Sequence, residues 1–235
     1  MSDNIFTLDD GGFVPVIIES RRGSHNITLR PKTAPEFEIH ISKPFFVPES
    51  QALKFLESKR KWVQNIFNRT PKKCVVCDGD EIEFLDRRVR LVRKPGARSN
   101  DLVQGADDKW IMYVGGAPEM FERRVRDTIK AELLKSIKEI IKETPREFWP
   151  ARIALRDTTT RWGSRSSTGT ISFSWRLAFA PVSVMRYVVM HELAHTKHMD
   201  HSPAFWRQVS ELYGFGVERV KRWLTQNGAG LHRYF

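Results

Sequence analysis

Apolar and polar residues alternate in short runs along the first forty residues, and this alternation predicts strands. We expect strands at 13–18, 26–29 and 37–41. The first two flank the turn-forming residues 21–24, which predict a hairpin between them. The pattern then changes, because apolar residues recur at helical spacing from residue 48 to about residue 69. The N-terminal part is therefore expected to be β-rich with one helix.

The longest periodic segment begins at Pro118 and predicts a helix that runs to about Thr144, just before Pro145. Its apolar stripe consists of Phe121, Val125, Ile129, Leu133, Ile137 and Ile141. The segment before it predicts a loop at 95–100 and strands at 82–85, 89–92 and 110–114. We expect this long helix to connect the β-rich part with the rest of the chain.

The C-terminal part combines a few strands with more helices. We expect strands at 152–156 and 170–175, and helices at 181–197, 202–214 and 217–226. No internal repeat is evident in the sequence. These elements predict an α+β fold with a β-rich N-terminal subdomain (1–116) and a second domain (117–235) that includes the long helix.

The composition is that of a soluble globular chain, with 40% apolar and 29% charged residues among 235. No apolar run approaches the roughly 20 residues that span a bilayer, so we expect no membrane partner. The start of the sequence lacks a secretory pattern, and Cys74 and Cys77 make no disulfide framework. We therefore expect a cytoplasmic location.

Basic residues outnumber acidic ones by 39 to 28, which gives a net charge of +11. Such an excess attracts polyanions, so nucleic acid and nucleotides are candidate partners. A solvated basic surface without a specific partner has the same signature. The sequence specifies no oligomeric state.

The residues His191-Glu192-Leu193-Ala194-His195 carry the clearest chemistry in the chain. They fall in a predicted helix, where residues four apart share a face, so both imidazoles can reach one metal ion. Glu192 between them is placed to act as general base toward water that the metal activates. A hydrolytic metal site is therefore the leading interpretation.

A catalytic zinc site takes about three protein ligands, so a third one is expected downstream. His198 lies roughly 10 Å beyond His191 along an unbroken helix, too far to share the ion. His201 precedes the helix-start pair Ser202-Pro203, and a bend before that pair can return it to the metal. We favour His201 as the third ligand, with Glu211 as the alternative.

The C-terminal half resembles a known family in the order and spacing of its motifs. The matching residues are Arg161–Ser164, Ile171–Leu177, His191–His195, His201-Ser202 and Phe205-Trp206. Together they are similar to the YgjP-like, SprT-type zinc metallopeptidases. The N-terminal half is similar to that family only in general layout.

The resemblance implies a zincin-like metallopeptidase core with one zinc ion, bound by His191, His195 and His201. It also implies that Glu192 is the catalytic base and that the substrate is a peptide or protein. The leading hypothesis is thus zinc-dependent hydrolysis of peptide bonds. Two alternatives use the same site, namely a metal-dependent nucleotide phosphohydrolase and a DNA-associated protein with a zinc protease-like site.

Two positions depart from the family's pattern. Arg165 stands where cysteine is usual, and Ser174 stands where asparagine is common. Neither is a predicted ligand, so the departures concern substrate contacts rather than the metal. The nearby strand at 171–175 is either an ordinary core strand or one that offers backbone groups to an extended peptide.

Overall fold

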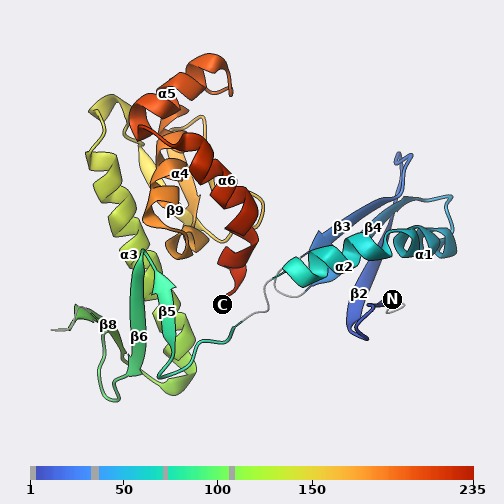
Figure 1. Cartoon of the computed structure of the whole chain (residues 1–235), viewed down its shortest axis with the longest axis horizontal. Helices are drawn as coiled ribbons and strands as arrows, with labels where there is room; N and C mark the ends of the chain where they lie inside the picture. Colours follow the sequence, from blue (N-terminus) through green and yellow to red (C-terminus); the bar gives the residue numbers. More distant parts are fainter. Residues whose placement is uncertain (1–3, 33–36, 71–73, 106–108) are drawn as a thin grey trace. The chain divides into compact units, whose positions relative to one another are not determined.

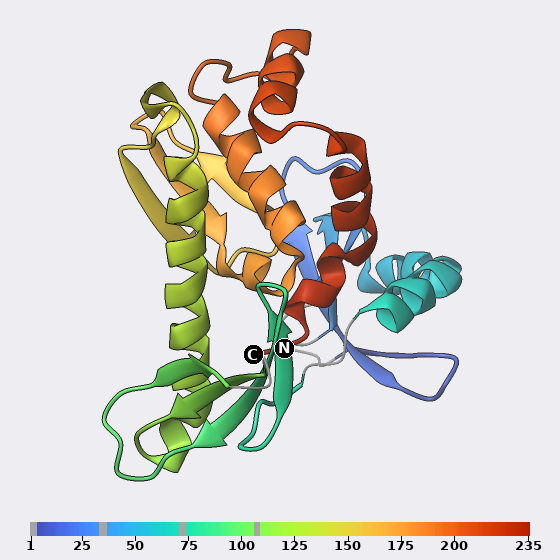
Figure 2. The same ribbon diagram turned by 60° about the vertical axis from the view of Figure 1, so that its left-hand side comes forward.

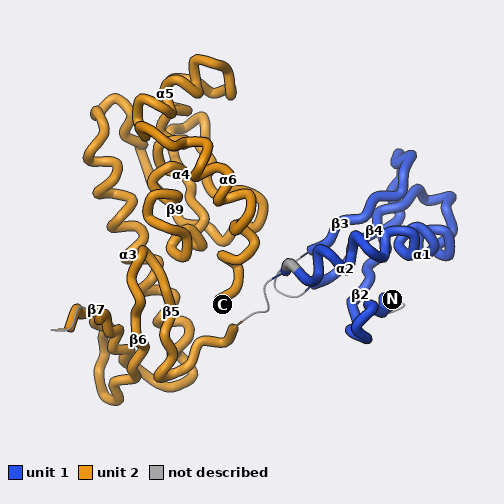
Figure 3. Tube along the Cα trace, viewed as in Figure 1, with its two compact units in different colours: residues 1–72 blue, residues 73–235 orange. Residues whose placement is uncertain are grey.

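The chain forms two compact units. The computed structural model describes residues 4–32, 37–70, 74–105 and 109–235. Unit 1 comprises residues 1–72 and unit 2 comprises residues 73–235, as Figure 3 shows. Each unit has its own hydrophobic core. The boundary expected between residues 116 and 117 falls inside unit 2 instead.

Unit 1 is a four-stranded sheet with two helices packed on one face (Figure 1). Its elements are β1 (Asn4–Thr7), β2 (Phe13–Arg21), β3 (Thr28–Lys32), β4 (Glu38–Pro44), α1 (Glu49–Ser58) and α2 (Arg60–Arg69). Alternate residues of β2 such as Val14 and Val16 are buried, while those between them are exposed. Ala52 and Leu56 of α1 and Val63 of α2 complete this core.

The strand order in unit 1 is β1-β2-β4-β3, so the hairpin predicted between strands 13–18 and 26–29 is wrong. β2 pairs in parallel with β4, and β3 pairs antiparallel with the other side of β4. Burial explains this order, because Ile39 and Ile41 of β4 are fully buried whereas β3 has no buried residue. The more apolar strand therefore lies inside the sheet, and the more polar β3 lies at its edge.

The single helix predicted from residue 48 to about residue 69 is two helices, with Lys59 between them. Lys59 leaves helical geometry at φ −104° and ψ 13°. Arg60, which begins α2, donates hydrogen bonds to the Glu57 carboxylate (2.9 Å) and to the Thr7 carbonyl (2.6 Å). Periodicity does not reveal this break, because apolar residues keep helical spacing on both sides of it.

Unit 2 begins with a second four-stranded sheet that packs against the long helix α3 (Figure 2). The elements are β5 (Glu81–Phe84), β6 (Arg87–Arg93), β7 (Asp101–Gln104), β8 (Trp110–Val114) and α3 (Phe121–Lys142). The whole predicted apolar stripe of α3 is buried, which confirms that prediction. The stripe shares one core with Leu91 and Met112 of the sheet, so the boundary between units lies before this sheet.

The two four-stranded sheets have the same strand order, β1-β2-β4-β3 in unit 1 and β5-β6-β8-β7 in unit 2. In both sheets the central pair is parallel and the two outer pairs are antiparallel. Helices that follow directly in the chain cover one face of each sheet. The repeat is one of topology, and it has no counterpart in the sequence pattern.

The remainder of unit 2 combines a three-stranded sheet with helices. The elements are β9 (Arg152–Arg156), β10 (Gly163–Arg165), β11 (Thr170–Ser174), α4 (Val182–Ala194), α5 (Pro203–Tyr213) and α6 (Val217–Asn227), with 3₁₀ turns at 118–120, 146–148, 175–179 and 228–232. The sheet order is β10-β11-β9. α4 contacts β10, α3, α5 and α6, so it lies at the centre of this part of the fold.

The fold is α+β, as predicted. The pattern does not predict the strands β1, β7 and β10, which are four residues long or shorter. Unlike β5, which is also four residues long, these strands do not alternate apolar and polar residues, so only pairing defines them. Within the described residues, no helix combines the length and the apolar character needed to cross a membrane.

Separate cores predict that the two units unfold separately. Ile39→Ala removes a fully buried side chain from unit 1 and should lower that unit's free energy of unfolding by about 2–5 kcal/mol. Ile129→Ala should act in the same way on unit 2 alone. Backbone hydrogen exchange, read separately for each unit, measures both effects. Equal loss of protection in both units from either variant would contradict the two-core description.

Candidate metal centre and active site

α4 presents the residues of the H-E-x-x-H motif. The helix is buried on nearly all sides because it packs against β10, α3, α5 and α6. His191 and Glu192 lie in its last turn, and His195 is its C-terminal cap residue. The interior of unit 2 therefore fixes the backbone that carries these three side chains.

The chain bends after His195 and brings His201 back toward α4. α4 ends in tight backbone turns over residues 193–198. Ser202 then caps α5, because its hydroxyl accepts a hydrogen bond from the Phe205 amide (3.4 Å). A helix end and a helix start thus follow each other closely, and His201 lies between them.

His191, His195 and His201 meet at one point. Their ligand nitrogens lie within 4.8 Å of one another, and no second group of this kind occurs among the described residues. The Nε2 atoms of His191 and His201 are 3.3 Å apart. Glu211, the alternative third ligand, lies outside this group and accepts a hydrogen bond from Gln208 (3.0 Å).

His198 contributes its backbone rather than its imidazole. Its carbonyl oxygen lies 2.9 Å from Nδ1 of His195. When Nδ1 carries the proton and donates it to this carbonyl, Nε2 of His195 keeps a lone pair for a metal ion. His198 therefore orients a candidate ligand without being one.

The ring of Phe205 supports all three imidazoles. It is fully buried and stacks on His195, with ring centroids 4.5 Å apart and an interplanar angle of 28°. Its edges meet the rings of His191 and His201 at 4.9 Å and 4.8 Å. Trp206 lies 5.8 Å from these same two rings. This aromatic packing restricts the rotamers of the three histidines.

The surroundings of His191 and His195 favour the neutral form of both imidazoles. Burial lowers the pKa of His191 to about 4, and the nearby His195, His201 and Lys221 act in the same direction. Burial also lowers the pKa of His195. Both imidazoles are therefore neutral near pH 7, the form that binds a metal. This donor set fits a divalent ion.

Glu192 is buried against the first residue of β10. A side-chain carbon on Gly163 would lie 2.5 Å from both Cγ and Oε1 of Glu192, so only glycine leaves room for this carboxyl group. Burial raises the pKa of Glu192 to about 7, while the charges of Arg161 and Arg165 oppose the rise. The carboxyl group thus has a proton affinity suited to general base catalysis near neutral pH.

The strand with a free edge beside the site is β10. β11 pairs with β10 on one side and with β9 on the other, so its backbone groups are used within the sheet. The suggestion that the strand at 171–175 offers its backbone to a peptide is therefore wrong. β10 pairs with β11 alone in the described part of the chain, and its Gly163 touches Glu192.

Three features of the site are not evident from the motif. The sequence pattern around Gly163 is that of a turn. A glycine in a strand indicates that another group comes close to the backbone, but it does not identify that group as Glu192. Phe205 follows a predicted helix cap, which indicates burial but not contact with three imidazoles. The His198 carbonyl belongs to the bend that the sequence predicts, but its partner is visible only in the structure.

Comparison with known proteins points to one family. The family described as YgjP-like, metallopeptidase domain, matches residues 25–227. Among solved structures, the chain is similar to the metallopeptidase zymogen abylysin of Pyrococcus abyssi, with 28% identity, a TM-score of 0.32, and coverage of 45% of this chain and 98% of that one. No curated protein matches the chain.

Gly163→Ala should displace Glu192 while metal stays bound, because the added methyl group has no room beside Cγ and Oε1. A general base contributes roughly 10²–10⁴-fold, so we expect at least a tenfold loss of hydrolytic rate with unchanged metal content. The matched control is Gly230→Ala, where a methyl group meets nothing within 4 Å. A fully active Gly163→Ala protein would show that the contact does not position Glu192.

The two histidines beyond the motif should differ in their effect on metal affinity. His201→Ala removes one of the three converging nitrogens, and we expect zinc affinity to fall by at least roughly tenfold. His198→Ala keeps the carbonyl that holds His195, so zinc affinity should stay within about twofold. Zinc titration against a competing chelator measures both values. A loss of zinc affinity in His198→Ala, with unchanged affinity in His201→Ala, would make His198 the third ligand instead of His201.

Proposed function

The chain belongs to the YgjP-like metallopeptidase-domain family, and on that premise we propose that it hydrolyses peptide bonds with one zinc ion and with Glu192 as general base. The observation that carries the proposal is the cluster of three histidines together with the buried carboxyl group of Glu192, which follows His191 on α4. Peptidase activity follows from the family, whereas the metal and the roles of individual residues are our assignment.

His191, His195 and His201 would hold the zinc ion. Magnesium and calcium prefer oxygen ligands, so a set made of imidazoles alone disfavours both. Three protein ligands are typical of catalytic zinc sites, which keep one position for water or substrate. When bound, zinc lowers the pKa of water and polarises the carbonyl group that is attacked.

Glu192 moves the proton in this proposal. Its carboxylate takes a proton from the attacking water, whose oxygen forms a bond with the carbonyl carbon of the peptide. The same carboxyl group gives that proton to the leaving nitrogen as the C–N bond breaks, so the products are a carboxylic acid and an amine. The contact with Gly163 holds Glu192 in place for both transfers.

An extended peptide fits the free edge of β10. One side of this strand is paired with β11, and within the described chain the other side has no strand partner. A peptide that pairs with that side would form backbone hydrogen bonds, as in other complexes where a peptide adds a strand to a sheet. Gly163 is on β10 and touches Glu192, so a peptide bound there would run past the base.

The zinc-loaded protein should cleave an unfolded protein substrate, lose this activity with a chelator and regain it with added zinc. Glu192→Gln should keep zinc but lower kcat by roughly 10²–10⁴-fold, because the amide cannot accept the proton. Metal analysis of the same samples separates loss of zinc from loss of the base. A zinc-loaded Glu192→Gln protein with full activity would remove Glu192 from its proposed role.

Nucleotides serve as the contrasting substrate in the same assay. Chelator-sensitive release of phosphate or pyrophosphate, without cleavage of any protein substrate, would contradict peptide hydrolysis and favour a phosphohydrolase. Cleavage that occurs only when the protein substrate is bound to DNA would place the peptidase in a DNA-associated role.

A further inference from the structure

A cationic hollow lies beside the edge strand of the site. Its volume is about 410 Å³, and Gly163 forms part of its wall. Two arginines and four hydroxyl-bearing residues line it, namely Arg156, Arg161, Thr158, Thr160, Ser164 and Ser172. No acidic residue is among the residues that line it. The hollow therefore offers positive charge and hydrogen-bond donors without a negative counterpart.

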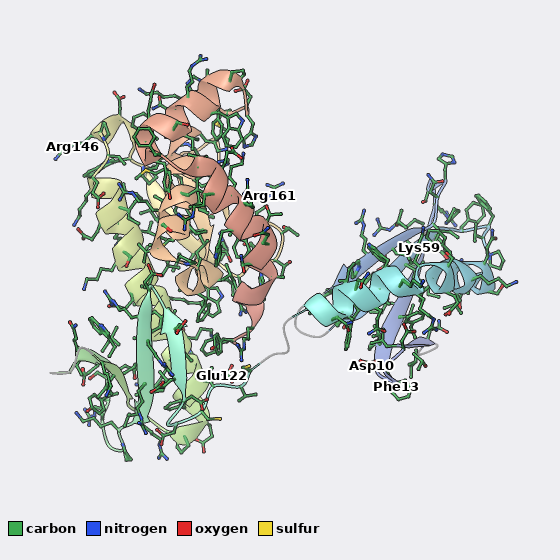
Figure 4. All side chains as sticks on the ribbon, in the orientation of Figure 1. Asp10, Phe13, Lys59, Glu122, Arg146 and Arg161 are labelled. Carbon is green, nitrogen blue, oxygen red and sulfur yellow. The ribbon has the colours of Figure 1, made fainter. Side chains whose placement is uncertain are left out.

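The two arginines of the hollow have no ion-pair partner among the described residues. Asp157, the acid next to Arg156 in sequence, is already bound by Arg176 through two hydrogen bonds of 3.0 Å and 3.2 Å. Both Arg156 and Arg161 are exposed, and Figure 4 shows Arg161 at the surface of unit 2. Two unpaired guanidinium groups that line one hollow form a site for an anion.

The hollow is next to the proposed catalytic base. Gly163 belongs to its wall and also lies against the side chain of Glu192. An anion held in the hollow would therefore lie close to the residue that contacts Glu192.

Strand geometry links the hollow to a bound peptide. Gly163 faces Glu192 on α4, and successive strand residues point to opposite faces, so Ser164 faces away from α4. Ser164 pairs with Ser172 across the sheet, and both line the hollow. A peptide paired with the free edge of β10 alternates in the same way. Every second side chain of that peptide would point to the face on which the hollow opens.

We propose that this hollow is a specificity subsite, in which Arg156 and Arg161 bind the acidic side chain of a substrate residue that flanks the cleaved bond. The inference rests on the proposed function, because it takes the ligand to be part of the peptide substrate. An arginine guanidinium binds a carboxylate through two parallel hydrogen bonds, and the surrounding hydroxyls add further donors.

A carboxylate suits this hollow better than a nucleic acid. Sites for single-stranded nucleic acid combine positive charge with exposed aromatic rings on which bases stack. The one aromatic residue that lines the hollow, Phe173, is fully buried and offers no such surface.

The test compares peptides that differ at a single position. A cleavage site is first found in an unfolded protein, and peptides are then made with Glu, Gln or Lys at each flanking position and with amidated C-termini. At one flanking position we expect the wild-type protein to prefer Glu over Gln by about tenfold in kcat/KM, as charge-assisted hydrogen bonds allow. Arg156→Gln and Arg161→Gln should each reduce this preference, and Arg161→Glu should shift it toward Lys.

Arg152→Gln is the matched control. Arg152 is an exposed arginine of β9, four residues before Arg156 and on the same face of the sheet, but it does not line the hollow. The control removes the same charge and should leave the preference unchanged. The unfolding temperature of each variant shows whether a lost preference comes from a lost fold.

Binding of the same peptides to the zinc-loaded Glu192→Gln protein measures the subsite without turnover. If the wild type cleaves no unfolded protein, peptides of one arbitrary sequence with Glu, Gln or Lys at each position replace them, and a preference for Glu in binding would then overturn the proposed function and keep the subsite. Equal affinity and equal cleavage of the Glu, Gln and Lys peptides would overturn the subsite and keep the peptidase. A single-stranded oligonucleotide whose binding depends on Arg156 and Arg161, with no preference among peptides, would assign the hollow to nucleic acid instead.

Discussion

The contact between Glu192 and the backbone of Gly163 is the constraint on which the rest of the site depends. The Glu192 side chain lies this close to β10 only because residue 163 has no side chain. Three other helices enclose α4, so its backbone has little freedom to move away. The packing of α4 against β10 also places the edge of the sheet beside Glu192. One absent side chain thus determines where the proposed proton acceptor lies relative to the edge strand.

Local pattern predicts the features of this protein that depend on local geometry. The stripe of α3 and the helix that carries His191 and His195 follow from spacing along the chain, because a helix is defined by neighbours in sequence. The return of His201 follows from a helix end and a helix start a few residues apart. These elements and the proposed ligand set therefore required no knowledge of the tertiary structure.

Features that depend on pairing between distant segments are not encoded in periodicity. β4 lies between β2 and β3 because of burial in three dimensions, and the sequence suggests the simpler hairpin. β10 has three residues and becomes a strand only through its pairing with β11. The role of Gly163 depends on a helix that begins well after it in the chain. For this reason the motif leads to the proposed chemistry, whereas the proposed substrate edge can be recognised only in the fold.

The repeated strand order bears on how such a chain can diversify. The helices α1 and α2 cover the buried face of the first sheet. The helix α3 covers the buried face of the second sheet and also packs against α4. Loss or exchange of the first sheet with its helices leaves the buried core of the other unit complete. Loss of the second sheet would expose one side of α3, the helix that packs against α4. Of two sheets with one topology, the second shares its buried core with the helix that carries His191 and Glu192, whereas the first does not.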